Sequence, residues 1–463
     1  MQLPQALINQ LEGVKGFEKE SFLEVHQSGA QVTSVRLNPQ KVSADAFLQH
    51  SAFALPERVP WTANGFYLTK RPSFTFDPLF HAGTYYVQEA SSMFLEQAFT
   101  QTADVSKPLN VLDLCAAPGG KSTHLQSLIS SDSLLVSNEV IKNRAGILRQ
   151  NIIKWGSANV VVTNNDPQHF ARLGGFFDVM VVDAPCSGSG LFRRDSEAIR
   201  EWSEEAVQLC CGRQKRIIAD ALPALKEEGI LIYSTCSYSP QEDEELADWL
   251  VGEMGMENLR LSLTEDWNIV ETESGETKAF GYRFFPDKVK GEGFYIAAFK
   301  RKNKHVEGRL KAARLEKCTA KEQDIVQPWL NTTSVQLLKH HSIYALPHTL
   351  VESYSLVRSA LSIQYAGVAI GEVMKNKLVP DHALAVSGLL SPAVAQTPLN
   401  FNEAIRYLQK ADFNIETSVK GWQTVTYGGH NLGWINALQN RINNYYPKEL
   451  RILKQSDDAA FEK

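Results

Sequence analysis

Two cysteines follow short apolar segments, in positions where a reaction can take place. Cys186 lies in the run DAPCSGSG and Cys236 in the run YSTCS, and the preceding residues 179–182 and 229–233 are apolar and bounded by turn-forming residues. Such runs are typical of buried parallel strands. Ligands of parallel sheets bind beyond the carboxyl ends of the strands, and neighbouring strands lie ~5 Å apart. If these two strands are neighbours, both sulfurs can reach one substrate, which favours a reaction that needs two thiols.

A glycine-containing turn predicts a nucleotide-type ligand. Apolar residues 111–114 run into a turn of small residues and paired glycines, namely Cys115, Ala116, Ala117, Pro118, Gly119, Gly120 and Lys121. Small residues let a ligand approach the backbone, and the helix that follows points unpaired N–H groups at it. Two ligands compete for this turn. A phosphate loop would need glycine where Cys115 stands, although Lys121 and Asp183 fit its lysine and its magnesium-binding acid. We favour an adenosine-containing cofactor, because the missing glycine removes a backbone position on which a phosphate loop depends.

Carboxylates near the ends of the predicted strands support an adenosyl cofactor. Glu139 follows the second strand, nineteen positions after Gly120, close to where an acid binds ribose hydroxyls in dinucleotide folds. Asp166 lies just past the third strand, where its carboxylate can accept a hydrogen bond from an adenine amine. Taken singly, Asp113, Glu139 and Asp166 are each explained equally well as a strand-end cap or a surface charge.

A thiolate, a second thiol, a carboxylate and an adenosyl cofactor together indicate methylation of a pyrimidine carbon. Pyrimidine C5 is a poor nucleophile, but addition of a thiolate at C6 makes the ring an enamine whose C5 attacks an electrophilic methyl group. The thiol has a free pKa of about 8.5, so it needs activation, which Lys121 and a sulfonium cofactor would supply. Asp183 can hydrogen-bond N3 and the exocyclic amine of the base. The spacing alone does not order the two cysteines.

The elements that position these motifs alternate between strand and helix from residue 110 to about residue 300. Strands are predicted at residues 111–114, 134–137, 159–163, 179–182, 229–233 and 293–299, with helices at 121–130, 142–155 and 206–225. This alternation is typical of an α/β fold with a doubly wound, Rossmann-like sheet covered by helices on both faces.

At 463 residues, the chain is expected to form several domains. We predict a small N-terminal α/β accessory domain over residues 1–105, a catalytic domain over 106–302, a basic linker over 303–330 and a mostly β region over 331–463. In this last region, residues 342–346, 349–356 and 368–374 are predicted as strands.

The composition excludes several classes of protein. Apolar and charged fractions of 43% and 21% are ordinary for a globular protein, and no stretch approaches the ~18 apolar residues of a membrane span. The first residues lack the pattern of a secretory signal, so we expect a cytoplasmic protein without a membrane partner. The six cysteines include no CxxC pair, so neither a disulfide framework nor a bound metal is expected.

A basic stretch follows the predicted catalytic residues. Residues 281–317 contain eleven Lys or Arg against four acids, which gives this stretch +7 while the remainder carries −12. Its interleaved aromatics (Tyr282, Phe284, Phe285, Phe294 and Tyr295) can offer stacking faces beside phosphate contacts. The alternative is a solvated linker after a core hairpin whose aromatics are buried.

Three motifs, in this order and spacing, resemble those of the Nol/Nop/Sun family of RNA cytosine-5 methyltransferases. They are CAAPGGKS at residues 115–122, DAPCSGSG at 183–190 and YSTCS at 233–237. Residues 283–301 are similar to that family's closing hairpin, and the resemblance covers about residues 30–300. The outer regions resemble one bacterial branch, the ribosomal RNA small subunit methyltransferase F type, whose C-terminal part includes a PUA-like RNA-binding domain. Residues 367–385 and 433–447 fit that domain.

The resemblance implies a role for each motif residue. Cys236 is the expected nucleophile, and Cys186 is the thiol that helps to release the product. The turn at residues 115–121, with Glu139, Asp166 and Asp183, corresponds to the family's S-adenosylmethionine contacts. The implied substrate is a decoding-region cytidine of 16S rRNA, as naked RNA or within the 30S subunit, and a monomeric enzyme is expected. Two alternatives stay open: an RNA-stimulated, phosphate-loop-like NTPase and a non-catalytic RNA-binding protein.

Overall fold

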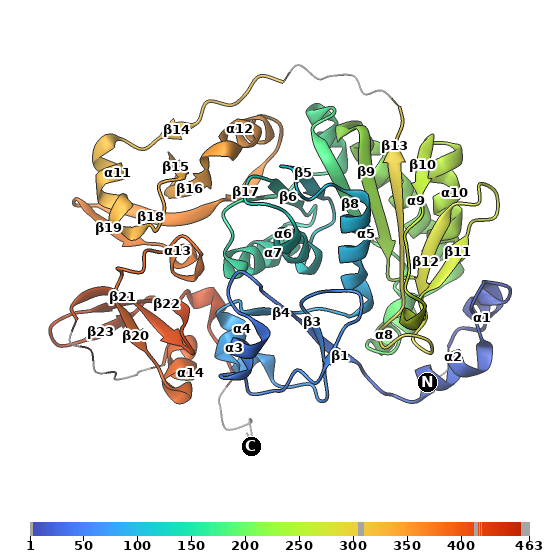
Figure 1. Cartoon of the computed structure of the whole chain (residues 1–463), viewed down its shortest axis with the longest axis horizontal. Coiled ribbons are helices and arrows are strands. Elements are labelled where there is room, and N and C mark those ends of the chain that lie inside the picture. Colours follow the sequence, from blue (N-terminus) through green and yellow to red (C-terminus); the bar gives the residue numbers. More distant parts are fainter. Residues whose placement is uncertain (1–2, 304–309, 412–414, 416, 418, 455–463) are drawn as a thin grey trace.

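A mixed sheet runs through the middle of the molecule and carries the predicted motifs (Figure 1). The computed structural model describes residues 3–303, 310–411, 415, 417 and 419–454. Over these residues the strand order across the sheet is β11-β12-β13-β9-β8-β5-β6-β7-β17, with β10 paired to β13. The bounds of these strands are β5 Asn110–Asp113, β6 Leu134–Asn138, β7 Val160–Thr163, β8 Phe177–Asp183, β9 Leu225–Thr235, β10 Met256–Leu259, β11 Val270–Glu273, β12 Phe280–Phe284, β13 Phe294–Arg301 and β17 Ile363–Ala366.

The centre of this sheet is parallel and reverses its strand order at one point. Strands β7, β6, β5, β8 and β9 are parallel neighbours in that order, so the chain runs outward from β5 in both directions. Ligands of such sheets bind at the carboxyl ends of the strands where the order reverses, here between β5 and β8. The predicted doubly wound, Rossmann-like sheet is confirmed, and the strands that precede Cys186 and Cys236 are neighbours.

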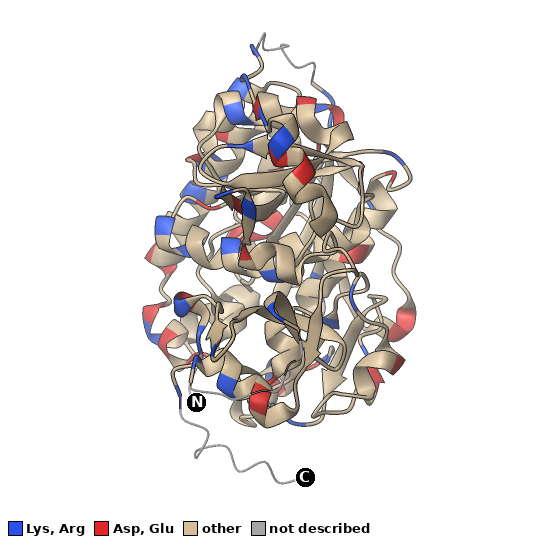
Figure 2. Cartoon of the chain, turned by 90° about the vertical axis from the view of Figure 1, so that its left-hand side faces the viewer, with Lys and Arg blue, Asp and Glu red and all other residues tan. Residues whose placement is uncertain are grey.

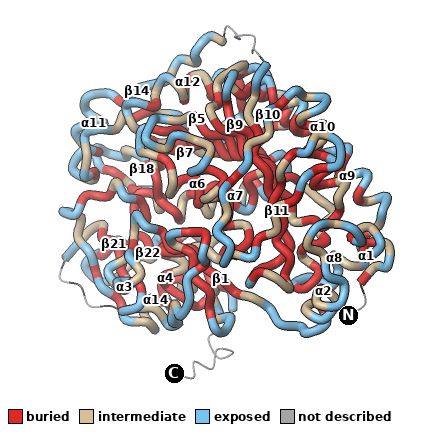
Figure 3. Tube along the Cα trace, turned by 45° about the vertical axis from the view of Figure 1, so that its right-hand side comes forward, coloured by how far each residue is buried: buried red, intermediate tan, exposed pale blue. Residues whose placement is uncertain are grey.

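Alternate residues of the central strands pack against two layers of helices. On β8, Val179 and Val181 pack in the cluster that contains α5 (Leu95–Thr102), α6 (Gly120–Leu128) and α7 (Lys142–Trp155). Met180 and Val182 pack in the cluster that contains α9 (Glu204–Ala221) and α10 (Glu244–Gly252). Figure 3 shows β5 and β9 inside the buried interior. Strands covered on both faces are apolar throughout, which explains why these short runs are recognisable in the sequence.

The N-terminal region combines helices with a small antiparallel sheet of order β2-β3-β1-β4. Its elements are α1 Gln5–Leu11, α2 Lys19–Gln27, β1 Thr33–Leu37, α3 Ala44–Leu48, β2 Glu57–Arg58, β3 Gly65–Leu68, α4 Pro78–His81 and β4 Tyr85–Val87. Helices α1 and α2 pack in one apolar cluster with Tyr238 and Phe285. This region therefore supports the segment that follows Cys236, and the predicted N-terminal α/β domain is confirmed.

The C-terminal region contains two further sheets, of order β14-β15-β16-β18-β19 and β20-β21-β22-β23 (Figure 1). The strands are β14 Glu316–Lys317, β15 Val335–Lys339, β16 Ile343–Pro347, β18 Val368–Met374, β19 Lys377–Pro380, β20 Gln396–Pro398, β21 Gly421–Tyr427, β22 His430–Ala437 and β23 Ile442–Asn444. The helices are α11 Ala320–Val326, α12 Val351–Ala360, α13 His382–Val386 and α14 Phe401–Gln409. The region is β-rich, as predicted, but its strand β17 pairs antiparallel with β7 and extends the central sheet.

One predicted strand of this region is wrong. Residues 349–356 are predicted as a strand, but α12 occupies most of this range. Leu350, Tyr354 and Val357 are buried on one side of the helix, at spacings of four and three residues. The apolar positions therefore follow a helical period rather than the two-residue period of a strand.

The basic stretch at residues 281–317 is not a stacking surface. All five of its aromatics are buried, so the predicted alternative of a core hairpin holds for them. Among its described cations, Lys288 pairs with Glu18, Lys290 with Glu57, and Lys302 with Glu228. Lys304 and Arg309 lie outside the described residues. Figure 2 shows basic and acidic segments interspersed over the face that it views. Within the described residues, acids of neighbouring segments therefore pair with five cations of the stretch and neutralise its charge in part.

Among the residues described, no helix combines the length and apolar character needed to cross a membrane.

Candidate active site

The two predicted cysteines face each other at the carboxyl ends of neighbouring strands. Cys236 directly follows β9 and Cys186 lies three residues after β8, and their sulfurs are 3.0 Å apart. Both residues are half-buried, so a substrate can reach them. The hydrogen bond with Cys236, together with burial, raises the pKa of the Cys186 thiol well above its ordinary value. Cys186 therefore keeps its proton at neutral pH.

A buried carboxylate that the sequence did not single out ties the two cysteine segments together. Glu242 accepts hydrogen bonds from the Ser187 amide (2.9 Å), the Ser187 hydroxyl (2.5 Å) and the Ser237 hydroxyl (2.6 Å). Gln214 donates a fourth, at 3.0 Å, and its side-chain nitrogen also donates to the Pro185 carbonyl at 3.1 Å. Each serine directly follows one of the cysteines. Glu242 therefore fixes the position of one cysteine segment relative to the other.

An ion pair lies beside the thiols. Lys121 Nζ is 2.8 Å from Asp183 Oδ2, and the Ser234 hydroxyl donates to Asp183 Oδ1 at 2.9 Å. Burial lowers the pKa of Lys121, but the charge of Asp183 and its hydrogen bond outweigh this, and the pKa is raised overall. Lys121 is thus a fixed positive charge, and its charge interacts with Cys236. The sequence predicted both residues, and the structure joins them to the thiol pair.

The glycine turn lies across the point where the strand order reverses. Gly119 has a φ of +116°, and a Cβ there would lie 3.3 Å from Leu148 Cδ1 and 3.4 Å from Asn151 Cβ. A left-handed backbone this close to α7 favours glycine. Within the turn, burial and the charge of Asp113 raise the pKa of the Cys115 thiol, so this third cysteine stays protonated.

The buried side chain of Arg36, on strand β1 of the N-terminal sheet, forms hydrogen bonds with the end of this turn and the start of α6. The Arg36 guanidinium donates to the Gly120 carbonyl at 3.2 Å, to the Thr123 hydroxyl at 2.7 Å and to Gln88 Oε1 at 2.8 Å. Its Cζ lies 4.7 Å from the Trp155 ring centroid. Burial lowers the pKa of Arg36 to about 9, so it remains a cation at neutral pH. The N-terminal region therefore holds the first turn of α6 in place.

The predicted acids lie around the turn, in different surroundings. Glu139 is buried, accepts from the Ile141 amide at 2.9 Å and lies 3.6 Å from Arg144 Nη1. Asp166 caps the 3-10 helix that follows β7 and lies 3.4 Å from Arg216 Nη1. Glu139 is therefore held rigidly, while Asp166 is more open to solvent.

Asp113 is the most deeply buried of the acids predicted from the sequence. It accepts from the Ser122 hydroxyl at 2.6 Å, while its Oδ1 has no hydrogen-bond partner among the described residues. Burial, followed by the charges of Asp183 and Glu139, raises the pKa of Asp113 to about 7. A concentration of acids with an unpartnered buried oxygen suits a ligand that is positively charged. An adenosyl sulfonium cofactor fits this donor set better than a triphosphate, which would add negative charge.

The comparisons with known proteins agree with this geometry. A family model described as 16S rRNA methyltransferase RsmB/F matches residues 102–300, and models of the RsmF N-terminal and PUA domains match residues 3–90 and 395–452. A ribosomal RNA small subunit methyltransferase F from Psychromonas ingrahamii is 30% identical over 475 residues, with 97% of each chain covered. The chain belongs to the 16S rRNA methyltransferase F family. A protein of the same name from Vibrio vulnificus is 28% identical, again with 97% of each chain covered.

The fold of this chain is similar to the folds of solved structures. A methyltransferase homologue from Pyrococcus horikoshii is 28% identical with a TM-score of 0.52, and the match covers 65% of this chain and 100% of that one. NSun6 from the same organism is 18% identical with a TM-score of 0.53 and supports the fold alone.

Membership of the methyltransferase F family favours neither alternative left open by the sequence, the NTPase or the non-catalytic RNA-binding protein. The family does not favour the NTPase, and the Ser122 hydroxyl, which a phosphate loop directs at magnesium, instead donates to Asp113.

The PUA match includes residues 433–447 as predicted, whereas residues 367–385 lie outside it.

Two residues of the site, Glu242 and Arg36, were missed by sequence reasoning. Glu242 lies six positions after Cys236 in a run of acids, and Arg36 lies in β1 between the apolar residues Val35 and Leu37. A charged residue inside an apolar strand is a signal, because buried charges need partners. Neither partner set is local in sequence, so neither function could be assigned before the structure.

Proposed function

We propose that this protein methylates C5 of a cytidine in 16S rRNA, with S-adenosylmethionine as the methyl donor. The observation that carries the proposal is the 3.0 Å contact between Cys186 Sγ and Cys236 Sγ, beside the Lys121–Asp183 ion pair. Membership of the 16S rRNA methyltransferase F family supports the reaction class and the substrate. The match to a PUA domain supports RNA as the binding partner.

The protonation of Cys186 supports Cys236 as the nucleophile. A thiol that keeps its proton donates a hydrogen bond, so Cys236 is the sulfur that accepts it. The ammonium of Lys121, whose charge interacts with Cys236, lies where it can attract a negatively charged sulfur during the reaction. The two cysteines thereby take different roles although both follow parallel strands.

In the proposed reaction, the residues of the site act one after another on the cytosine ring. The Cys236 thiolate bonds to C6 of cytosine, which makes C5 able to attack an electrophilic methyl group. Asp183, held by Lys121 and Ser234, accepts a hydrogen bond from the exocyclic amine of the base. Once C5 is methylated, its proton passes to solvent water, and the electron pair of the C5–H bond restores the C5–C6 double bond as the bond between Cys236 and C6 breaks. Cys186 donates its proton to the departing sulfur, the product is released, and Cys186 regains a proton from solvent.

S-adenosylmethionine, when bound, supplies a methyl group activated by a positively charged sulfur. The residues that would hold it are those of the turn at 115–121, with Glu139 toward the ribose hydroxyls and Asp166 toward the adenine amine. The acids of the site would offset the positive charge of the donor.

Mapping of 5-methylcytosine tests the proposal. Purified protein is incubated with S-adenosylmethionine and either naked 16S rRNA or 30S subunits, and modified cytidines are located by bisulfite sequencing. We expect one modified cytidine with the wild-type protein, none with Cys236→Ala, and slow turnover with an accumulated protein–RNA adduct for Cys186→Ala. Cys210→Ala, a half-buried thiol on α9, is the matched control and should keep full activity. Full activity of Cys236→Ala would show that the assigned nucleophile is wrong.

A further inference from the structure

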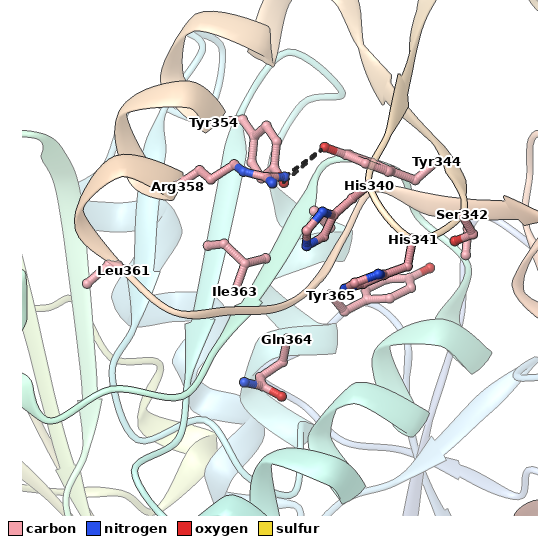
Figure 4. A pocket seen from close by; sticks show the side chains of 12 residues that line it. His340, His341, Ser342, Tyr344, Tyr354, Arg358, Leu361, Ile363, Gln364 and Tyr365 are labelled. Carbon is pink, nitrogen blue, oxygen red and sulfur yellow. Dashed lines mark hydrogen bonds between the residues drawn. The ribbon is translucent and has the colours of Figure 1, made fainter. Parts of the chain in front are cut away.

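A cavity of about 340 Å³ lies outside the active site, where the C-terminal region joins the central sheet (Figure 4). Its walls come from the turn between β15 and β16, from α12 and from β17. The volume falls within the ~300–1,000 Å³ of typical ligand pockets. None of the sequence motifs lies here, and the methyl-transfer chemistry does not use these residues.

One arginine with unused hydrogen-bond donors lines this cavity. Arg358 Nη1 donates to the hydroxyls of Tyr344 and Tyr354, each at 3.3 Å. Among the described residues, neither Nε nor Nη2 of Arg358 donates a hydrogen bond, and no carboxylate lies within ion-pairing distance of it. His340 and His341 lie opposite, with ring centroids 4.2 Å apart. Burial and the charges of Arg358 and His341 lower the pKa of His340. Arg358, a permanent cation without a carboxylate partner among the described residues, suits an anion such as a phosphate, and the neutral ring of His340 can donate a hydrogen bond to the same group.

Aromatic rings, imidazole rings and an amide lie beside Arg358 in the lining of the cavity. The side chains of Arg358, His340 and Tyr365 come from three different segments and point toward one another in Figure 4. Tyr344 and Tyr354 are buried at the base of the cavity, while His340, His341 and Gln364 are exposed at its rim. Aromatic and imidazole rings stack on nucleic-acid bases, and an amide such as Gln364 pairs with base edges.

The cavity also adjoins the cofactor side of the sheet. Its lining residues Leu361 and Ile363 flank Ser362, whose amide donates to Asn165 Oδ1 at 3.1 Å. The Asn164 amide in turn donates to the Ser362 carbonyl, also at 3.1 Å. Asn165 precedes Asp166, one of the acids of the cofactor site. A strand of RNA seated in the cavity would therefore lie close to the end of β7 that leads to Asp166.

We propose that this cavity binds one unstacked nucleotide of the RNA substrate, with its phosphate on Arg358 and His340 and its base against the rings of His341 and Tyr365. The inference rests on the proposed function in one respect, namely that the ligand is a single-stranded segment of the RNA to be methylated. The cavity is then a second RNA contact that anchors the substrate, separate from the thiols that react with it.

Direct RNA binding by the full-length protein tests this inference without any methylation. A fluorescein-labelled single-stranded oligoribonucleotide and 16S rRNA are titrated at several salt concentrations, with no cofactor present. For Arg358→Ala we expect affinity to fall roughly fivefold or more, and the slope of log affinity against log salt to decrease by about 0.7, as for one lost phosphate contact on a single strand. His340→Ala/His341→Ala, at an exposed turn, should weaken binding with no loss of folding. Arg260→Ala is the matched control, because that exposed guanidinium is already paired with Glu271.

The outcomes separate this inference from its alternatives. If Arg358→Ala is folded and binds RNA with wild-type affinity and salt slope, the inference is wrong. If Arg358→Ala does not fold, the histidine variant decides, and wild-type affinity there overturns the inference. Displacement of the oligonucleotide by AMP at equal concentration would identify a free-nucleotide site instead and would also overturn it. If the wild-type protein forms no 5-methylcytosine but the pocket variants still bind RNA weakly, the proposed function fails while the cavity assignment stands.

Discussion

Replacing Glu242 with glutamine tests whether the two cysteine segments depend on one shared carboxylate. The substitution keeps the shape of the side chain but removes its charge and turns one acceptor oxygen into a donor. If the remaining oxygen keeps the bonds from the Ser187 amide and Gln214, the hydroxyls of Ser187 and Ser237 face an NH₂ group. Both hydroxyls must then rotate from donating to accepting.

The magnitude follows from the bonds that change. A hydrogen bond to a charged group contributes ~1.5–3 kcal/mol and one between neutral groups ~0.5–1.5 kcal/mol, so two exchanged bonds cost about 2 kcal/mol of stability. Burial raises the pKa of Glu242, so removing the charge also relieves some of the cost of burying it. We therefore expect a net loss of about 1–2 kcal/mol in the free energy of unfolding. The kinetic effect is larger, because misplacing reacting groups by ~1 Å can cost on the order of 100-fold in rate.

Urea unfolding and single-turnover methyl transfer measure the two effects separately. We expect Glu242→Gln to lower kcat by roughly 10- to 100-fold with little change in KM for RNA, because the carboxylate is buried behind the cysteines. Glu245→Gln, an exposed acid in the first turn of α10, is the control and should match the wild type in both assays. A folded Glu242→Gln protein with wild-type kcat would refute the idea that this carboxylate positions the thiols.

Two further predictions concern the cofactor turn. Because burial and the neighbouring acids raise the pKa of Asp113 from its ordinary 3.8 to about 7, its carboxyl loses its proton as the pH rises through about 7, and the affinity for a cationic cofactor should rise with it. Calorimetry with S-adenosylmethionine between pH 6 and about 8 should show this rise for the wild type and a flat profile for Asp113→Asn; equal slopes would contradict it. Because this folded-state pKa is raised, the contribution of Asp113 to stability is present in acid, below the unfolded value, and is lost as the pH rises through about 7. Gly119→Ala forces a side chain into a left-handed backbone and against Leu148 and Asn151, so we expect a loss of ~1–3 kcal/mol and weaker cofactor binding. Gly146→Ala, in α7 with open space around it, should be neutral or slightly stabilising in the same thermal and binding assays, and equal behaviour of the two variants would contradict the strain argument.

Several parts of the fold were predictable because their signals are local. Runs of apolar residues such as 111–114 and 179–182 mark strands that are covered on both faces, and the small residues of the turn at 115–121 mark a close approach to the backbone. Cys186 and Cys236 stand directly after such runs, so their place at the carboxyl edge of the sheet follows from the strands themselves. The family resemblance then assigned them different roles, which spacing alone could not do.

Other features could not be predicted from the sequence, because the same local pattern of residues is compatible with two different structures. Residues 349–356 contain apolar side chains that suit a strand or a helix, and burial of Leu350, Tyr354 and Val357 on one side decided for the helix. The aromatics of the basic stretch suit stacking on bases or packing in a core, and their packing against residues of other segments, such as Trp61, Phe94 and Phe22, places them in the core. In each case the deciding partner lies far away along the chain.

By itself, the sequence predicted which residues react, and it determined at which strand ends they lie and the class of sheet that carries them. Tertiary structure alone decided that β8 and β9 are neighbours, that the two sulfurs are 3.0 Å apart, and that Glu242 and Arg36 hold the surrounding segments. The physical reason is that side-chain period and turn composition are encoded by adjacent residues. Strand pairing and the burial of a charge depend instead on free energies shared between segments that meet only after folding.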